Sequence, residues 1–291
     1  MIEPGVLLSE LLVPFQYDYM WKAMWVSALV GGVCAFLSAY LMLKGWSLMG
    51  DALAHSIVPG VAAAYIIGAP FALGAFVAGI LASLGMNFVK QQTRLREDTV
   101  IGLVFTALFA LGLLMASLRP AAVSMQTIVL GNILAIADED VVQVVVIALV
   151  SLAVLAFLWK DMMVTFFDEK HARSIGIRTG FLKAVFFILL SACTVAALQT
   201  VGALLVVAMV VTPGATAYLL TDRFGRLILL SIALGAGTSF AGAYLSYFLD
   251  GATGGLIVTL QTILFLLAFY FAPRHGVLAA RRRLMAAEKT A

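Results

Sequence analysis

Long apolar runs separated by short polar segments dominate the chain. A helix needs about 17 to 25 mostly apolar residues to cross the hydrocarbon core of a bilayer. The longest apolar stretch, 184–211, has no charge and is interrupted only by Gln199, Thr200 and Gly202, so we divide it there into two short helices. The pattern then predicts nine membrane-spanning helices, at 23–43, 51–68, 71–89, 99–118, 141–159, 183–201, 203–220, 227–248 and 255–272.

The basic residues give the predicted helices a direction. Lys and Arg collect in the cytoplasmic loops of membrane proteins. Lys183 and Arg223 both belong to basic groups, and placing both in the cytoplasm requires an even number of crossings between them, which supports the division. Nine crossings place the N-terminus outside and the C-terminus in the cytoplasm. All but Lys22 and Arg119 of the 18 basic residues then face the cytoplasm.

Composition agrees with an all-α polytopic membrane protein. Hydrophobic residues make up 63% of the chain, charged residues 11%, and the mean hydropathy is +1.08, whereas soluble domains are about 45 to 50% apolar and about 25% charged. We expect an N-terminal periplasmic or interfacial segment at 1–22, a transmembrane domain at 23–272 and a basic cytoplasmic tail at 273–291. Glu3 and Glu10 stand where a signal peptide would be basic, so we expect the first segment to be retained. The net charge of +3 does not indicate nucleic-acid binding.

Two of the predicted loops are long enough to hold structure. The outer loop, 119–140, is too apolar for a plain solvated loop, and we expect a short helix at the membrane interface. In the inner loop, 160–182, Asp168 can cap a short polar helix that runs through Ser174 and stops at Gly176.

Asp51 and His55 are the ionisable residues that stand out within a predicted span. Four residues apart on a helix, they share one face, about 5 to 6 Å apart. A carboxylate and an imidazole suit manganese, iron and zinc ions, but two ligands are too few, and the others must come from another helix, a second copy of the chain or water. The competing interpretations are that Asp51 is an ordinary N-cap and His55 a core residue. If the helix starts near Trp46, His55 approaches the midplane.

The remaining candidate residues carry weaker signals. We interpret His171 and His275 as solvated or headgroup-facing, and the apolar surroundings of Cys34 and Cys193 favour neither a disulfide nor a thiolate metal site. Pro213 predicts a broken or kinked helix. A phosphate-binding loop and a His-Glu-x-x-His motif are both absent from the sequence, so the chain has no visible energy source of its own.

Four segments together resemble the permease subunits of bacterial ATP-binding-cassette importers for manganese, iron and zinc, the ABC-3 metal permeases. They are LKGWSLMGDALAHSIVPGV, LGNILAIADED, FDEKHARSIGI and VGALLVVAMVVTPGATAYLLTDRFGR. The resemblance covers about residues 14–276 and is strongest to the manganese and iron branch.

The resemblance implies a non-enzymatic, multi-pass subunit of the bacterial inner membrane, with no cofactor of its own. Its partners would be two cytoplasmic ATPase subunits, an external metal-binding protein or lipoprotein, a second permease copy or paralogue, and membrane lipid. Asp51 and His55 match the family's metal-coordinating pair. The inner helix resembles the coupling helix that docks into the ATPase, which would comprise Asp168, Glu169, His171, Ala172, Arg173 and Gly176.

A stand-alone carrier that exchanges metal for protons at Asp51 and His55 remains the alternative to an ATP-driven permease. The polar inner helix separates the two hypotheses, because a carrier acting alone has no use for a docking element. An intramembrane enzyme is a distant third, since the sequence shows no evident nucleophile and base.

Overall fold

The computed structural model describes residues 11–46, 48–118, 138–273, 275–279 and 281, and every regular element among them is helical. The predicted all-α fold is therefore confirmed. The elements are η1 (Val13–Gln16), α2 (Asp18–Lys44), α3 (Met49–Ser56), α4 (Val58–Ile67), α5 (Phe71–Gln92), α6 (Glu97–Leu118), α8 (Asp138–Phe167), α9 (Glu169–Ser174), α10 (Thr179–Val201), α11 (Ala203–Leu220), α12 (Phe224–Leu249) and α13 (Thr253–Phe271). The helix expected within 119–140 falls largely outside the described residues.

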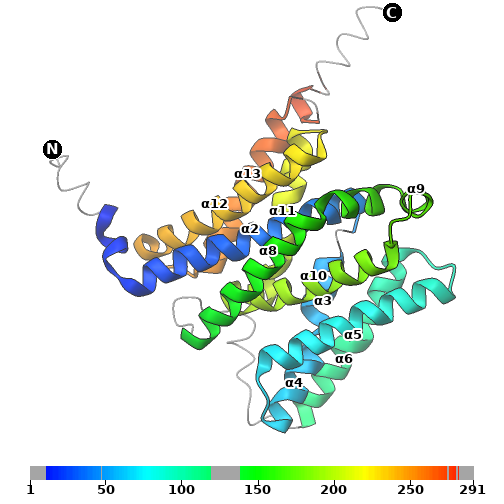
Figure 1. Cartoon of the computed structure of the whole chain (residues 1–291). Coiled ribbons are helices and arrows are strands. Elements are labelled where there is room, and N and C mark those ends of the chain that lie inside the picture. Colours follow the sequence, from blue (N-terminus) through cyan, green and yellow to red (C-terminus); the bar gives the residue numbers. More distant parts are fainter. Residues whose placement is uncertain (1–10, 47, 119–137, 274, 280, 282–291) are drawn as a thin grey trace, which may run out of the picture.

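Eight of the nine spans predicted from hydropathy correspond to helices of membrane-spanning length, and the span predicted at 203–220 corresponds to a shorter helix. Within the described part of the chain, eight helical segments are long and apolar enough to cross a membrane, counting α3 and α4 as one, and α11 is a shorter apolar helix. The long apolar stretch divides at Gly202, which joins α10 to α11 with φ +84°, a backbone conformation that favours glycine. In Figure 1, α2 begins at one end of the bundle and α13 ends at the other. Which end faces the cytoplasm stays a prediction.

Helix α2 is the centre of the bundle, and 83% of its apolar stretch is buried. It packs most extensively on α12 and α11. At the α2–α12 crossing, a Cβ added to Gly31 would lie 2.6 Å from the carbonyl oxygen of Gly235, so the two backbones touch where neither residue has a side chain. Small residues allow this close approach between membrane helices.

Ser38 of α2 holds α11 beside Pro213. Its hydroxyl donates to the Val211 carbonyl and accepts the Gly214 amide, both at 3.0 Å. Helix α11 continues through Pro213, so of the break or kink expected there the break is not observed and the kink stays a prediction. A proline removes one backbone donor, and the serine provides polar contacts on both sides of it.

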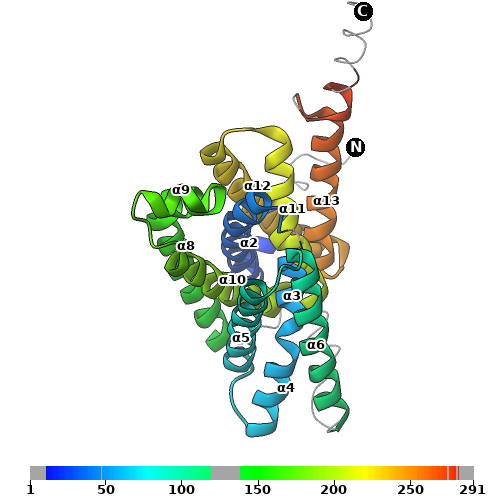
Figure 2. The ribbon, with the colours of Figure 1, turned by 90° about the vertical axis from the view of Figure 1, so that its right-hand side faces the viewer.

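The other helices form a flank and a connecting layer. Helices α3, α4, α5 and α6 lie together on one flank and α2, α11, α12 and α13 on the other (Figure 1). Helix α10 lies between them in contact with α5 and α2, and α8 packs on α2 and α10. Helix α3 packs between α6 and the pair α10 and α11 (Figure 2). Only 17% of the apolar stretch of α6 is buried. This flank therefore leaves much of its surface to lipid or to another chain.

Candidate functional site

Helix α3 places Asp51 inside its first turn rather than at its cap. The residue at the N-cap is Leu48, so Asp51 is the third helical residue. The N-cap alternative is therefore wrong. The start at Met49 also corrects the possibility that the helix begins near Trp46, so the Asp51–His55 pair lies within the first two turns of α3. A carboxylate near a helix N-terminus is favoured by the positive end of the helix dipole.

The structure brings Asp51 and His55 together. Nδ1 of His55 lies 3.1 Å from Oδ1 of Asp51 and 3.0 Å from the Asp51 backbone oxygen. With a proton on Nδ1, the ring donates to both oxygens and its Nε2 carries the lone pair that a metal ion needs. The Asp51 side chain is 39% exposed and the His55 side chain is 23% exposed. The pair can therefore be reached from outside the single chain.

A break in the helix follows directly after this pair. Helix α3 ends at Ser56, and α4 begins at Val58 with Pro59 in its first turn. Because Pro59 has no N–H, the His55 carbonyl loses the partner that a continuous helix would supply. Substrate sites of transporters are commonly formed where membrane helices are discontinuous. The interruption is confined to Ile57, which keeps helical backbone angles, so Asp51 and His55 lie directly before a local irregularity in one membrane span.

Two phenylalanines of α6 form an aromatic wall beside His55. The centroids of Phe105 and Phe109 lie 5.7 and 5.3 Å from that of the imidazole, with interplanar angles of 72° and 81°. These edge-to-face contacts fix the plane of the imidazole ring. Neither phenylalanine was predicted from the sequence to belong to the site. Their spacing of four placed them on one helix face, but nothing in the sequence identified α3 as the helix that this face contacts.

The other sequence candidates lie elsewhere. Nε2 of His275 lies 2.8 Å from Oδ1 of Asp222, and its ring stacks on Tyr218. His171 is exposed on α9. Across the described ranges, no group of three or more His, Cys, Asp and Glu residues is arranged to hold a metal ion. A single chain therefore presents two ligands of this kind at α3.

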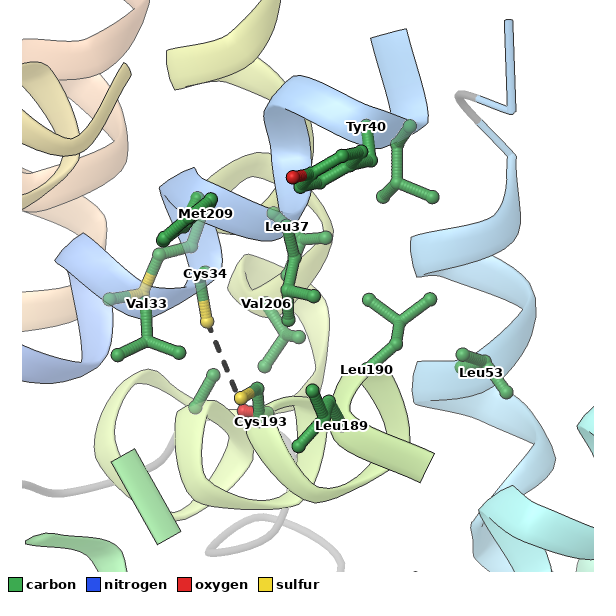
Figure 3. Close-up of a cluster of buried hydrophobic side chains, with 14 of the residues drawn as sticks. Val33, Cys34, Leu37, Tyr40, Leu53, Leu189, Leu190, Cys193, Val206 and Met209 are labelled. Atoms are coloured by element: carbon green, nitrogen blue, oxygen red, sulfur yellow. Dashed lines mark hydrogen bonds between the residues drawn. The ribbon is translucent and has the colours of Figure 1, made fainter. Parts of the chain in front are cut away.

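The two cysteines meet in the core between α2 and α10. Both are free and buried, and the Cys34 thiol points at the Cys193 carbonyl oxygen across 3.9 Å (Figure 3). Apolar side chains surround them, including Leu37, Val206 and Met209. They belong to the packing of α2 rather than to the Asp51–His55 site.

The short inner helix forms where the sequence predicts it, as α9. Asp168 caps it by accepting hydrogen bonds from the amides of Lys170 and His171, each at 3.0 Å. At the other end, Gly176 has φ +85°, and the amides of Gly176 and Ile177 bond back to the carbonyls of Arg173 and Ala172. This pair of bonds is the Schellman C-cap. Both predicted ends of the helix are therefore confirmed.

Glu169 fastens α9 to the start of α10. Its Oε2 lies 2.5 Å from Nζ of Lys183, and its Oε1 lies 2.6 Å from Nη2 of Arg173. Burial works to raise the pKa of the Glu169 carboxyl, but the hydrogen bonds and charges of Lys183 and Arg173 outweigh it, so that this pKa is lowered. Ala172 of α9 is fully buried. The helix is thus held in place by one apolar contact and one ion-pair cluster.

Comparison with known proteins identifies the family. The sequence profile of the ABC 3 transport family matches residues 16–272. The chain is 67% identical to the chelated iron transport system membrane protein YfeC of Yersinia pestis, over 95% of this chain and 94% of that one. It is 45% identical to the manganese transport system membrane protein MntB of Synechocystis sp., over 94% and 89%.

A solved structure agrees with this result. The structure of PsaBC from Streptococcus pneumoniae in complex with Fab superimposes with a TM-score of 0.83 and 32% sequence identity, and it covers 94% of this chain and 99% of that one. The apolar helices and these relatives make the protein a multi-pass inner membrane permease. The chain belongs to the ABC 3 transport family.

Proposed function

We propose that this permease carries Mn²⁺ or Fe²⁺ as its cargo and that Asp51 and His55 bind the ion on its way across the membrane. The observation that carries the proposal is the carboxylate oxygen 3.1 Å from the imidazole nitrogen, on a helix that breaks directly afterwards. Oxygen and nitrogen donors suit these ions, and zinc would also accept them. The relatives named for iron and manganese transport support the cargo class.

A second permease chain would complete the coordination. The two ligands are partly exposed on a flank whose helix α6 is mostly unburied, and manganese and iron sites generally need more ligands than two. Two copies that pair through this flank would bring two carboxylates and two imidazoles to one place. A related permease chain with the same pair would serve equally.

Energy would come from separate subunits. We propose that ATPase subunits dock on α9, because it is a capped, polar helix held on α10 by Glu169 and Lys183. A metal-binding protein would deliver the ion from the other side of the membrane. The permease itself would then perform no hydrolysis.

The test is metal uptake by whole transporters that carry Asp51→Asn or His55→Gln. Asp51→Asn keeps the shape of the side chain and removes its charge, and His55→Gln replaces the imidazole with a neutral amide that is a weaker ligand. Uptake of Mn²⁺ and Fe²⁺ should therefore fall about tenfold or more with unchanged protein in the membrane. His275→Gln is the matched control, because His275 also pairs with a carboxylate but lies away from α3. Wild-type uptake by both ligand variants would refute the metal pair. Uptake that persists without any ATPase subunit would instead support the stand-alone carrier.

A further inference from the structure

Trp46 lies in the short connection between α2 and α3, and its backbone is bonded to both helices. Its amide donates to the Leu41 carbonyl of α2 at 2.8 Å. Its carbonyl accepts from the amide of Met49, the first residue of α3, at 3.1 Å. Because Trp46 is bonded on both sides, a displacement of this residue would also displace the first turn of α3, in which Asp51 lies.

The indole ring of Trp46 contacts the two helices between which α9 is held. It stacks on Phe187 of α10, with centroids 5.6 Å apart and an interplanar angle of 17°. It meets Phe166 of α8 edge to face, at 5.7 Å and 79°. Phe166 is buried and lies two residues before Asp168, the N-cap of α9. Both ring pairs have geometries that stabilise a defined mutual orientation, so Trp46 is held by both neighbours of α9.

Phe187 is connected to α9 through Lys183. Lys183 and Phe187 are four residues apart on α10 and therefore share one face of that helix. The ammonium group of Lys183 lies 2.5 Å from the Glu169 carboxylate of α9. A continuous path of contacts thus leads from Glu169 along the start of α10 to Phe187, then to Trp46 and the first turn of α3.

The stacked rings of Trp46 and Phe187 border open space. They line a cavity of about 610 Å³, which Glu169 and Lys183 also line. In Figure 1 it belongs to the end of the bundle where α9, the start of α10 and the α5–α6 connection lie together. Side chains that are packed on every side cannot shift without strain, because protein interiors are close-packed. The ring pair has the cavity on one side, so it has room to follow a movement of α9 and α10.

We propose that Trp46 is a positioning residue that couples α9 to the metal pair. When the ATPase subunits move α9 and the start of α10, the stack on Phe187 would carry Trp46 with it, and the bond to Met49 would shift the turn that holds Asp51. The inference rests on the proposed function, because it requires docking on α9 and metal binding at Asp51. Coupling between two distant sites needs a connecting element that both of them bias. A tryptophan that served only as packing would lower stability when removed and would leave the ATP cost of transport unchanged.

The ratio of ATP hydrolysed to Mn²⁺ transported tests the proposal. The permease is reconstituted in liposomes with its ATPase subunits and metal-binding protein, and both quantities are measured in the same preparation. Trp46→Leu removes the ring and keeps the backbone bonds to α2 and α3. We expect this ratio to rise about fivefold, while the ATPase subunits stay attached. Trp46→Phe keeps a ring that can stack on Phe187 and should restore most of the coupling.

Further variants separate coupling from packing. Phe187→Leu removes the partner ring and should raise the ratio to the same extent as Trp46→Leu. The double variant should show no larger rise than either single variant, because both changes interrupt one path and their effects are then not additive. Phe181→Leu is the matched control on α10, where Phe181 is 62% exposed. Trp25→Leu is the matched control near the opposite end of α2, where Trp25 is 54% exposed. Both controls should keep the wild-type ratio.

Two results would overturn the role of Trp46. One is a wild-type ratio in Trp46→Leu or, if that variant does not assemble, in Phe187→Leu. The other is a rise in the double variant equal to the product of the two single rises, because the rings would then act independently. Failure of the proposed function shows in different variants: wild-type uptake by Asp51→Asn refutes the metal site, and wild-type uptake by Ala172→Pro refutes docking on α9. A normal ratio in Trp46→Leu leaves both of those results unaffected.

Discussion

The flank that contains α2 and the flank that carries Asp51 and His55 differ in how much of their central helices is buried. On the first flank, α2 buries 83% of its apolar stretch, and on the second, α6 buries 17%. The α2 flank closes on itself through glycine contacts and serine bonds, whereas the α3–α6 flank has a broken helix, a partly exposed ligand pair and an open aromatic wall. The contrast is one between α2 and α6 in particular, because α13 on the first flank buries 22% of its apolar stretch and the α3–α4 segment on the second buries 50%.

The largest expected effect is a loss of the whole fold, caused by a change at the α2–α12 contact, whereas the effects that follow are local. Gly31→Ala would place a Cβ 2.6 Å from the Gly235 carbonyl oxygen and against Ser239, so the backbones of α2 and α12 must separate. Overpacking of this kind costs about 1 to 3 kcal/mol or more. We expect a large fall in the thermal unfolding temperature and in the yield of folded protein, measured by size exclusion in detergent.

Its matched control is the next residue. A Cβ on Gly32 would meet its nearest neighbours at 3.5 and 3.7 Å, which is ordinary van der Waals contact. Gly32→Ala should therefore fold like the wild type. Equal stability of the two variants would show that the α2–α12 contact is not as close as the structure has it.

The second effect separates transport from folding. Ala172→Pro places a ring in the centre of α9 and removes a backbone donor, at a cost of about 3 kcal/mol or more, which a six-residue helix cannot absorb. We expect metal uptake to be lost and the ATPase subunits to dissociate, while the permease remains folded. If the Ala172→Pro variant still takes up metal and still binds the ATPase subunits, then α9 is only a solvated connection and has no role in docking.

The third effect acts on the α3–α6 flank, which carries Asp51 and His55. A Cβ on Gly112 of α6 would lie 2.7 Å from Cγ1 of Val58 and 2.8 Å from the Pro59 nitrogen, directly at the break between α3 and α4. Gly112→Ala should push α6 and its two phenylalanines away from His55. We expect the Mn²⁺ concentration at half-maximal uptake to rise several-fold, while the protein stays folded.

Gly102 provides the comparison on the same helix, because among the described residues no atom outside the adjacent backbone of α6 lies within 4 Å of a Cβ added there. Gly102→Ala should transport like the wild type. If Gly112→Ala does so too, then the packing of α6 on the break does not matter for metal binding.

How far the sequence predicts this molecule depends on the range of the interaction. The spans follow from bilayer thickness and the Asp51–His55 approach from helical spacing, because both are local properties of the chain. The contacts of Phe105 and Phe109 with His55 depend on which helices become neighbours, and hydropathy does not encode that. The division at Gly202 was predictable since charge placement demanded a turn, whereas the break after His55 showed only as Pro59.

The smallest effect concerns the link between α9 and α10, and it depends on pH. Because the pKa of Glu169 is lowered in the folded protein, its ion pairs stabilise the fold fully above the pKa of an unfolded glutamate, about 4.3. This contribution is lost as the pH falls through the lowered folded value. Solvent reaches these pairs, so the effect should stay below about 1 kcal/mol. We expect the wild type to lose more stability than Glu169→Gln between pH 7 and pH 3.5 in thermal unfolding. Glu139→Gln changes an exposed carboxylate at the far end of α8 and should retain the wild-type slope. If Glu169→Gln keeps that slope as well, Glu169 does not hold the two helices together.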